Sequence, residues 1–198
     1  MQKVSDTDFL SWAATHGIVP DTRYHEPRSL VYVPEGPTRF WEFPDLPAAW
    51  PAFVDRVLTG MEPWSACYVW PRGGRWPRAV ALKGPDDAVR EAVLRAAGIP
   101  LDFTGAARFE AGERDLVLTL LFVYMAFGGC VLDDLFVVPD HGRQFLMTSH
   151  HEVIHVHTAD GCPIEGLIGH MAGAGFRLPT ELPDETFKRP KWMGEAKA

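Results

Sequence analysis

The chain has few cysteines and no paired cysteine motif. Its 198 residues include three cysteines, Cys67, Cys130 and Cys162, which is an odd number without C-x-x-C spacing. Disulfide-stapled secreted domains and zinc ribbons carry even, closely spaced sets. The N-terminal sequence also lacks an apolar run behind Lys3, so it predicts no signal peptide. These absences argue against a disulfide framework and favour reduced thiols in a cytoplasmic protein.

The chain also lacks an excess of positive charge. Its formal net charge is −7, whereas nucleic acids and anionic membrane surfaces select basic patches. The basic residues that cluster do so in short segments that contain prolines, which predicts solvated loops. These residues are Arg72, Arg75 and Arg78 in the first half, and Lys188, Arg189 and Lys191 near the C-terminus. We therefore expect no nucleic-acid partner.

No apolar run is long enough to predict a membrane span. Residues 116–132 carry no charge, but a bilayer span needs about 20 residues. Gly128 and Gly129 interrupt the run, and Asp133 and Asp134 follow it directly. The run therefore predicts a buried core segment, and we expect no membrane association.

Catalytic loop motifs are missing as well. The chain has no G-x-S-x-G, no Walker-type glycine loop and no dinucleotide fingerprint. The glycine-rich residues 71–75 lack the following helix that a phosphate site needs, and they predict the turn of a β-hairpin instead.

What the chain does have is a globular composition, with 46% apolar and 23% charged residues. Apolar spacing and capping residues predict helices, the first of them capped by Ser5 and stopped by Gly17. Pro51 is expected to delay the start of the second helix. The predicted helices cover about 5–17, 45–58, 85–97 and 163–174, and the predicted early strands cover 29–33 and 67–70.

Two regions decide the fold class. Residues 113–127 fit a buried helix or a long buried strand, and their length favours helix because strands seldom pass about ten residues. From about residue 133 to 157 the spacing of apolar residues changes to that of short β-strands separated by turns, which predicts an antiparallel meander. The sequence therefore predicts a single α+β domain over residues 1–178, with an antiparallel sheet and four to five helices. Residues 179–198 form a proline-rich, charged tail.

The strongest chemical signal is a histidine cluster. Five of the eight histidines lie close together, at His141, His150, His151, His155 and His157. Imidazole is the commonest zinc ligand and the side chain that titrates nearest neutral pH. The cluster therefore points to a metal site or to proton transfer.

Part of this cluster reads H-E-x-x-H and resembles the zincin metallopeptidase signature. The resemblance covers five residues and implies that His151 and His155 bind zinc while Glu152 acts as general base. This arrangement requires a helix. The residues between and after the two histidines are mostly β-branched, however, and glycines bracket the region, so the local sequence favours a strand.

A strand allows two other interpretations. In the first, His151, His155 and His157 share one face and hold a metal for a hydrolase, with a carboxylate as a further ligand. That carboxylate would come from Asp133, Asp134 or Asp160. In the second, Ile154 and Val156 point into the core, His155 and His157 face solvent, and no ligand binds. The second interpretation is the simpler one, because exposed imidazoles need no partner.

Aromatic residues and arginines gather in the first half of the chain. Trp and Arg are enriched at the energetic centres of protein interfaces, although large rings are more often core. The candidate partner-binding residues are Trp41, Trp70, Arg72, Arg75 and Trp76.

The sequence thus favours a non-enzymatic cytoplasmic protein that binds another protein as an accessory, adaptor or toxin-neutralising factor, without a cofactor. A zinc-dependent hydrolase built on the histidine cluster is the alternative. The sequence identifies neither the partner nor the oligomeric state.

Overall fold

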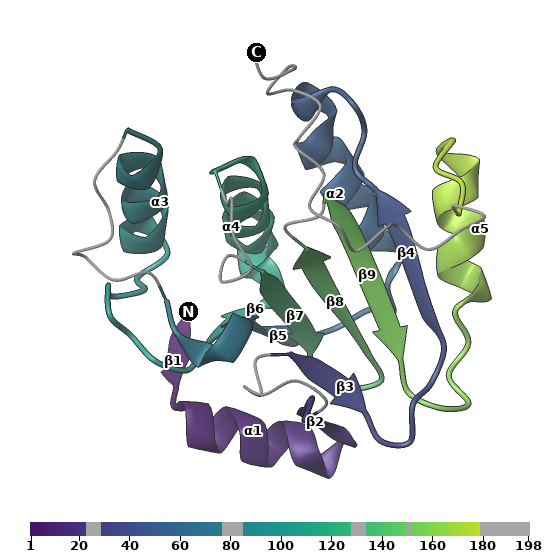
Figure 1. The fold of residues 1–198 in the computed structure, drawn as a ribbon, viewed down its shortest axis with the longest axis horizontal. Coiled ribbons are helices and arrows are strands. Elements are labelled where there is room, and N and C mark those ends of the chain that lie inside the picture. The colour runs from purple at the N-terminus through teal and green to yellow at the C-terminus, as the bar shows by residue number, and fades with distance from the viewer. Residues whose placement is uncertain (23–28, 77–84, 128–133, 150–151, 179–198) are drawn as a thin grey trace, which may run out of the picture.

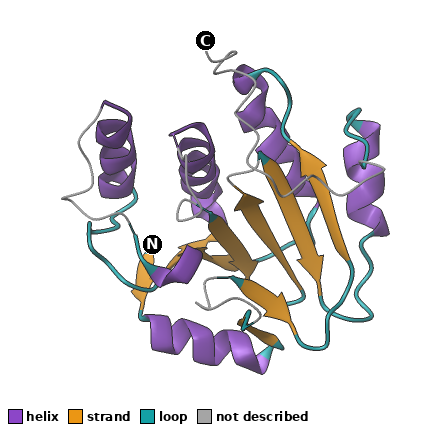
Figure 2. Cartoon of the chain, viewed as in Figure 1, coloured by secondary structure: helices purple, strands orange, loops and turns teal. Residues whose placement is uncertain are grey.

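The computed structural model describes residues 1–22, 29–76, 85–127, 134–149 and 152–178. Its main element is an antiparallel sheet of seven strands in the order β1-β6-β5-β7-β8-β9-β4 (Figures 1 and 2). The strands are β1 (Gln2–Val4), β4 (Thr38–Glu42), β5 (Ala66–Pro71), β6 (Ala106–Glu110), β7 (Leu135–Pro139), β8 (Gln144–Ser149) and β9 (Val153–Thr158). A separate two-stranded sheet pairs β2 (Ile18–Pro20) with β3 (Leu30–Tyr32).

Five α-helices accompany the sheets, which confirms the predicted α+β class. They are α1 (Asp6–Thr15), α2 (Trp50–Gly60), α3 (Pro85–Ala96), α4 (Arg114–Phe127) and α5 (Glu165–Gly173). Helices α3, α4, α2 and α5 stand in a row along one face of the sheet, while α1 lies with β2 and β3 on the other side (Figure 1).

The row of helices covers the larger of two hydrophobic cores. Phe53, Val57 and Leu120 from α2 and α4 pack with Val69 and Val137 from the sheet, and all five are fully buried. The smaller core joins α1 and the β2–β3 pair to the opposite face. Since side chains alternate along a strand, consecutive residues of β5 and β7 enter different cores, and β7 is buried along its whole length.

Local sequence signals explain several element boundaries. The Ser5 hydroxyl accepts a hydrogen bond from the Asp8 backbone N–H at 3.1 Å, which caps α1 as predicted. Pro51 lies in the first turn of α2, and a short 3₁₀ turn at Pro47–Ala49 precedes that helix, so the predicted delay is confirmed.

Residues 113–127 are confirmed as mainly helix, because α4 occupies Arg114–Phe127. No helix in the described ranges combines the length and apolarity that crossing a bilayer requires. The predicted meander is also confirmed, since β7, β8 and β9 pair in sequence order.

The predicted hairpin turn at residues 71–75 is wrong. Arg72–Gly74 forms a 3₁₀ turn, and β5 already has a partner along each edge, β6 on one side and β7 on the other. No place is left for a strand that returns directly from this turn. The predicted tail, residues 179–198, lies outside the described residues.

A buried ion pair fixes the turn that follows β5. Arg72 Nη1 lies 2.7 Å from Asp134 Oδ2, and the Asp134 side chain is completely buried while that of Arg72 is 18% exposed. The Arg72 backbone N–H also donates to the Asp134 carbonyl at 2.9 Å. At the same end of β5, the Trp70 indole N–H donates a hydrogen bond to the Asp6 carboxylate at 2.7 Å. This bond links α1 to the end of the strand. These contacts connect three segments that are remote in sequence.

We expect Asp134→Asn to lower the free energy of unfolding by about 3 kcal/mol, because it leaves the Arg72 guanidinium without its buried counter-ion. Urea denaturation followed by circular dichroism measures the change. Asp160→Asn, which neutralises an exposed carboxylate, is the control and should change stability by less than about 0.5 kcal/mol. Equal stability of the two variants would show that the pair does not hold this turn.

Candidate functional site

Strand β9 carries the second half of the histidine cluster. Ile154 and Val156 are fully buried on the helix side of the sheet, as predicted for a strand. His155 and His157 lie on the opposite face, but they are half-buried rather than solvent-facing. The His157 ring stacks on Phe145 with a centroid separation of 4.5 Å and an interplanar angle of 18°. The smaller core thus extends under these histidines.

The structure brings two of the three proposed metal ligands near each other. The ring centroids of His155 and His157 are 6.1 Å apart, with the rings nearly parallel. His150 and His151 lie outside the described residues. Within the described ranges, no group of three or more His, Cys, Asp or Glu side chains is placed to hold a metal ion.

The described part of the H-E-x-x-H pentapeptide, residues 152–155, forms a turn and the start of β9 rather than the helix that the zincin arrangement requires. Glu152, the proposed general base, lies in the turn before β9 with a positive φ of 60°. Its backbone carbonyl accepts a hydrogen bond from the Phe43 N–H at 2.9 Å. His155 lies on the strand itself, where side chains alternate between faces and do not repeat at the one-turn spacing of a helix.

A small cavity adjoins the last of these histidines. It has a volume of about 120 Å³ and is lined by Val31, Tyr32, Glu35, Gly36, Thr38 and His157. Thr38 Oγ1 and His157 Nδ1 are 3.0 Å apart, which fixes the plane of the imidazole. The Tyr32 hydroxyl donates to the Gly142 carbonyl at 2.9 Å, and burial raises its pKa well above the usual range. Tyr32 therefore stays neutral and structural.

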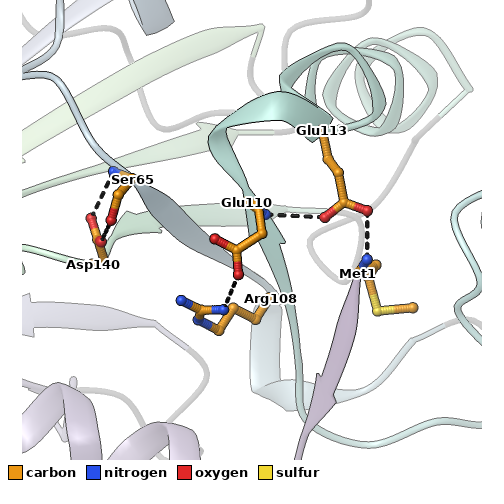
Figure 3. Close-up of polar contacts among 6 residues, drawn as sticks. All are labelled: Met1, Ser65, Arg108, Glu110, Glu113 and Asp140. Carbon is orange, nitrogen blue, oxygen red and sulfur yellow. Dashed lines mark hydrogen bonds and ion pairs between the residues drawn. The ribbon is translucent and has the colours of Figure 1, made fainter.

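Ser65 and Asp140 are hydrogen-bonded to each other at the start of β5 (Figure 3), and His141 follows Asp140 in the chain, but the three residues do not have the order of a catalytic triad. The Ser65 hydroxyl donates to the Asp140 carboxylate, and the Ser65 backbone N–H donates to the same group at 3.3 Å. His141 Nδ1 accepts from the Arg143 N–H at 3.1 Å, so the imidazole does not lie between the other two groups. The contacts fasten the β7–β8 turn to β5.

Two further groups drawn in Figure 3 are structural. Arg108 pairs with Glu110 on β6, and the Glu113 carboxylate bridges the Glu110 backbone N–H and the Met1 amino group. The hydrogen bond from that amino group holds the pKa of Glu113 below its usual range. These contacts hold the residues that precede α4 next to the N-terminal end of β1.

The three tryptophans predicted to bind a partner are core residues. Trp41, Trp70 and Trp76 are only 1–2% exposed. Arg72 is engaged with Asp134, whereas Arg75 is exposed. Of the five predicted partner-binding residues, Arg75 is the exposed one, and partner binding by this set stays a prediction.

Trp41 differs from the other two tryptophans in its hydrogen bonding. The Trp70 indole donates to Asp6, and the Trp76 indole donates to the Gly105 carbonyl at 2.9 Å. The Trp41 Nε1–H is buried and has no acceptor among the residues that the structure describes. Buried polar groups are almost always hydrogen-bonded, and each exception needs an explanation.

Trp41 also lines a hollow in the surface, which we call the Trp41 groove. Its volume is about 510 Å³. One wall comes from the residues that leave β4 and the other from the residues that follow α5. The lining consists of Trp41, Glu42, Phe43, Pro44 and Asp45, together with Gly175, Phe176, Arg177 and Leu178. Leu46, the residue after Asp45 in the chain, is 72% exposed.

Sequence reasoning found Trp41 but missed the rest of this groove. Its two walls are more than a hundred residues apart, so no local pattern joins them. One signal was present, because Leu46 lies between Pro44 and Pro47 in a short proline turn where an apolar side chain has little room to be buried.

Comparison with known proteins adds no family to this description. The chain matches no protein-family model, no curated protein sequence and no solved structure.

We expect the Ser65–Asp140 contact to make stability depend on acid pH. Burial alone would raise the pKa of Asp140, but hydrogen bonds from Ser65 and the Ala66 backbone lower it overall. A depressed folded pKa contributes stability that is complete above the unfolded value of about 3.9 and is lost as the pH falls through the folded value. Asp140→Asn should therefore destabilise the protein near neutral pH and lose this effect in acid.

Urea midpoints measured from about pH 6 down to about pH 2.5 check this expectation. Ser65→Ala removes one donor and should give a smaller shift in the same direction. A stability difference between Asp140→Asn and the parent chain that stays constant over the whole range would contradict the assignment.

Proposed function

We propose that this chain is a non-catalytic binding protein that takes a segment of a protein partner in the Trp41 groove. The observation that carries the proposal is the buried Trp41 indole N–H without an acceptor in the lining of a hollow of about 510 Å³. An unsatisfied buried donor costs about 1–3 kcal/mol. A ligand carbonyl or carboxylate that reaches this nitrogen when the groove lining shifts would recover that energy on binding.

The apolar part of the groove supports a peptide rather than a small polar ligand. The Phe43 and Phe176 rings both pack against Phe53, with centroid separations of 5.7 Å and 4.9 Å, so the aromatic lining is anchored in the larger core. Leu46, the next residue in the chain after the lining residue Asp45, adds an exposed apolar side chain. Deep aromatic positions surrounded by polar residues are typical of binding hot spots in protein interfaces.

The role we infer is that of an accessory, adaptor or toxin-neutralising factor in the cytoplasm, and neither a metal nor a cofactor enters it. The sequence supports this role through its net negative charge and through its odd number of cysteines, which lack C-x-x-C spacing. The histidine cluster supports a metal-dependent hydrolase less well, because the described part of β9 supplies two imidazoles from one strand and no third ligand joins them there.

Selection of a random-peptide display library on the immobilised full chain tests the proposal. We expect enriched peptides whose affinity falls about tenfold on Trp41→Phe, because this change keeps most of the aromatic bulk but deletes the buried donor, at a cost of about 1.4 kcal/mol. Leu46→Ala should also weaken binding without lowering stability, since the side chain is exposed. Isothermal titration calorimetry measures both effects.

Trp76→Phe is the matched control, because it makes the same chemical change at a buried tryptophan outside the groove. Its peptide affinity should equal that of the parent chain even if its stability falls. The proposal is overturned if no peptide is enriched, or if Trp41→Phe and Trp76→Phe reduce affinity equally.

A further inference from the structure

Strand β4 is an edge strand of the large sheet, because it pairs with β9 on one side only. In an antiparallel pair, residues that exchange backbone hydrogen bonds with the neighbouring strand alternate with residues whose backbone groups point away from it. The Phe43 N–H donates to the Glu152 carbonyl, and the Thr158 N–H donates to the Pro37 carbonyl. These two bonds assign the odd-numbered residues of β4 to β9 and the even-numbered residues to the open edge.

The open edge offers backbone donors and acceptors at Phe40 and Glu42. The carbonyl of Thr38, the first residue on this edge, accepts a hydrogen bond from the Arg39 side chain at 2.9 Å. Within the described part of the chain, no hydrogen bond reaches the backbone N–H or C=O of Phe40 or Glu42. Unpaired backbone groups on an edge strand form a template for a further strand.

The open edge leads into the Trp41 groove and is short. Glu42 belongs to the groove lining, and the wall formed by residues 175–178 stands across the hollow from it. Pro37 and Pro44 flank β4, and proline lacks the N–H that would continue a ladder. A short edge that faces a second wall suits one extended segment better than the whole sheet of a second copy.

We propose that the partner segment binds as an additional β-strand, antiparallel to β4 and hydrogen-bonded to the backbone of Phe40 and Glu42. This inference rests on the proposed function, and it adds the conformation and the side-chain chemistry of the segment. A peptide that adds a strand to a sheet edge gains affinity from main-chain hydrogen bonds and specificity from its alternate side chains.

The register determines which side chains the segment needs, because residues directly opposite each other point to the same face. The partner residue opposite Trp41 points to the helix side, where Phe43 and Phe176 line the groove, so an apolar side chain suits it. The residue opposite the exposed Glu42 lies on the other face, where a Lys or Arg would pair with the carboxylate. An apolar residue suits the position opposite the half-buried Phe40. In the direction of the partner chain, the expected motif is a cation followed by two apolar residues.

Amide hydrogen exchange in the ¹⁵N-labelled full chain, followed by NMR, tests these hydrogen bonds directly. In the free chain, the N–H groups of Phe40 and Glu42 should exchange faster than those of Arg39 and Trp41, which face β9. A saturating peptide selected from the display library should slow exchange at Phe40 and Glu42 by at least about tenfold. The alternation along β4 should then disappear.

N-methylation of the peptide removes one main-chain donor at a time. A methyl group on either residue opposite Phe40 or Glu42 should lower affinity by at least about tenfold. Methylation of the residue between them should have a much smaller effect, because its N–H points away from β4. Isothermal titration calorimetry measures the pattern.

Glu42→Gln tests the charge of the segment. It should weaken peptides that carry the cation by about threefold and reduce the salt dependence of their binding. Glu91→Gln is the matched control, because it makes the same change on α3, at the other end of the row of helices (Figure 1). It should leave peptide affinity unchanged.

The outcomes separate this inference from the proposed function. Peptides that bind with the expected dependence on Trp41, while Phe40 and Glu42 keep their free-chain exchange rates, would overturn the strand addition and leave the proposed function intact. Protection of these two amides in the free chain at every concentration would show that the chain covers its own edge. Protection that grows with protein concentration would show that a second copy covers it, and either result overturns the inference. If no peptide is enriched, both proposals fail.

Discussion

The structure depends on the burial of the central strands from both sides. Strands β5 and β7 alternate large apolar residues on both faces, and β7 has no exposed position. Such strands are stable only when each face is covered, which is why the chain builds two cores. The row of helices covers one face, and α1 with the β2–β3 pair covers part of the other. The half-buried setting of His155 and His157 follows from this arrangement, because they lie on the face that is covered incompletely.

The fold class and most helices could be predicted because their sequence signals are local and span only one or two helical turns. The Ser5 cap, the prolines before α2 and the length of the apolar run in α4 are all local. Strands β1 and β2 have three residues each, too few to show a period, and β4 and β6 have five. The hairpin prediction failed because the partners of β5 come from β6 and β7, far along the chain. Pairing between distant strands leaves no mark in a single sequence.

The candidate site was predictable only in part for a related reason. Trp41 was recognised as a ring beside charged residues, but Trp70 and Trp76 have the same sequence context, and all three are buried in the core. What separates them is whether the indole N–H finds an acceptor after folding, and this depends on Asp6 and Gly105, which lie elsewhere in the chain. The second wall of the groove, residues 175–178, gave no signal at all. Local chemistry therefore identified a candidate residue but not the groove to which it belongs.

The proline turn that forms one wall of the groove has a consequence for binding entropy. Pro44 and Pro47 have fixed φ angles, the Pro44 carbonyl accepts from the Trp50 indole at 2.8 Å, and the Phe43 N–H is held by Glu152. This wall is already ordered before any ligand arrives. Because ordering a loop on association is one of the main costs of binding, little of that cost falls on this wall. The loss of freedom on binding would fall mostly on the segment that enters the groove.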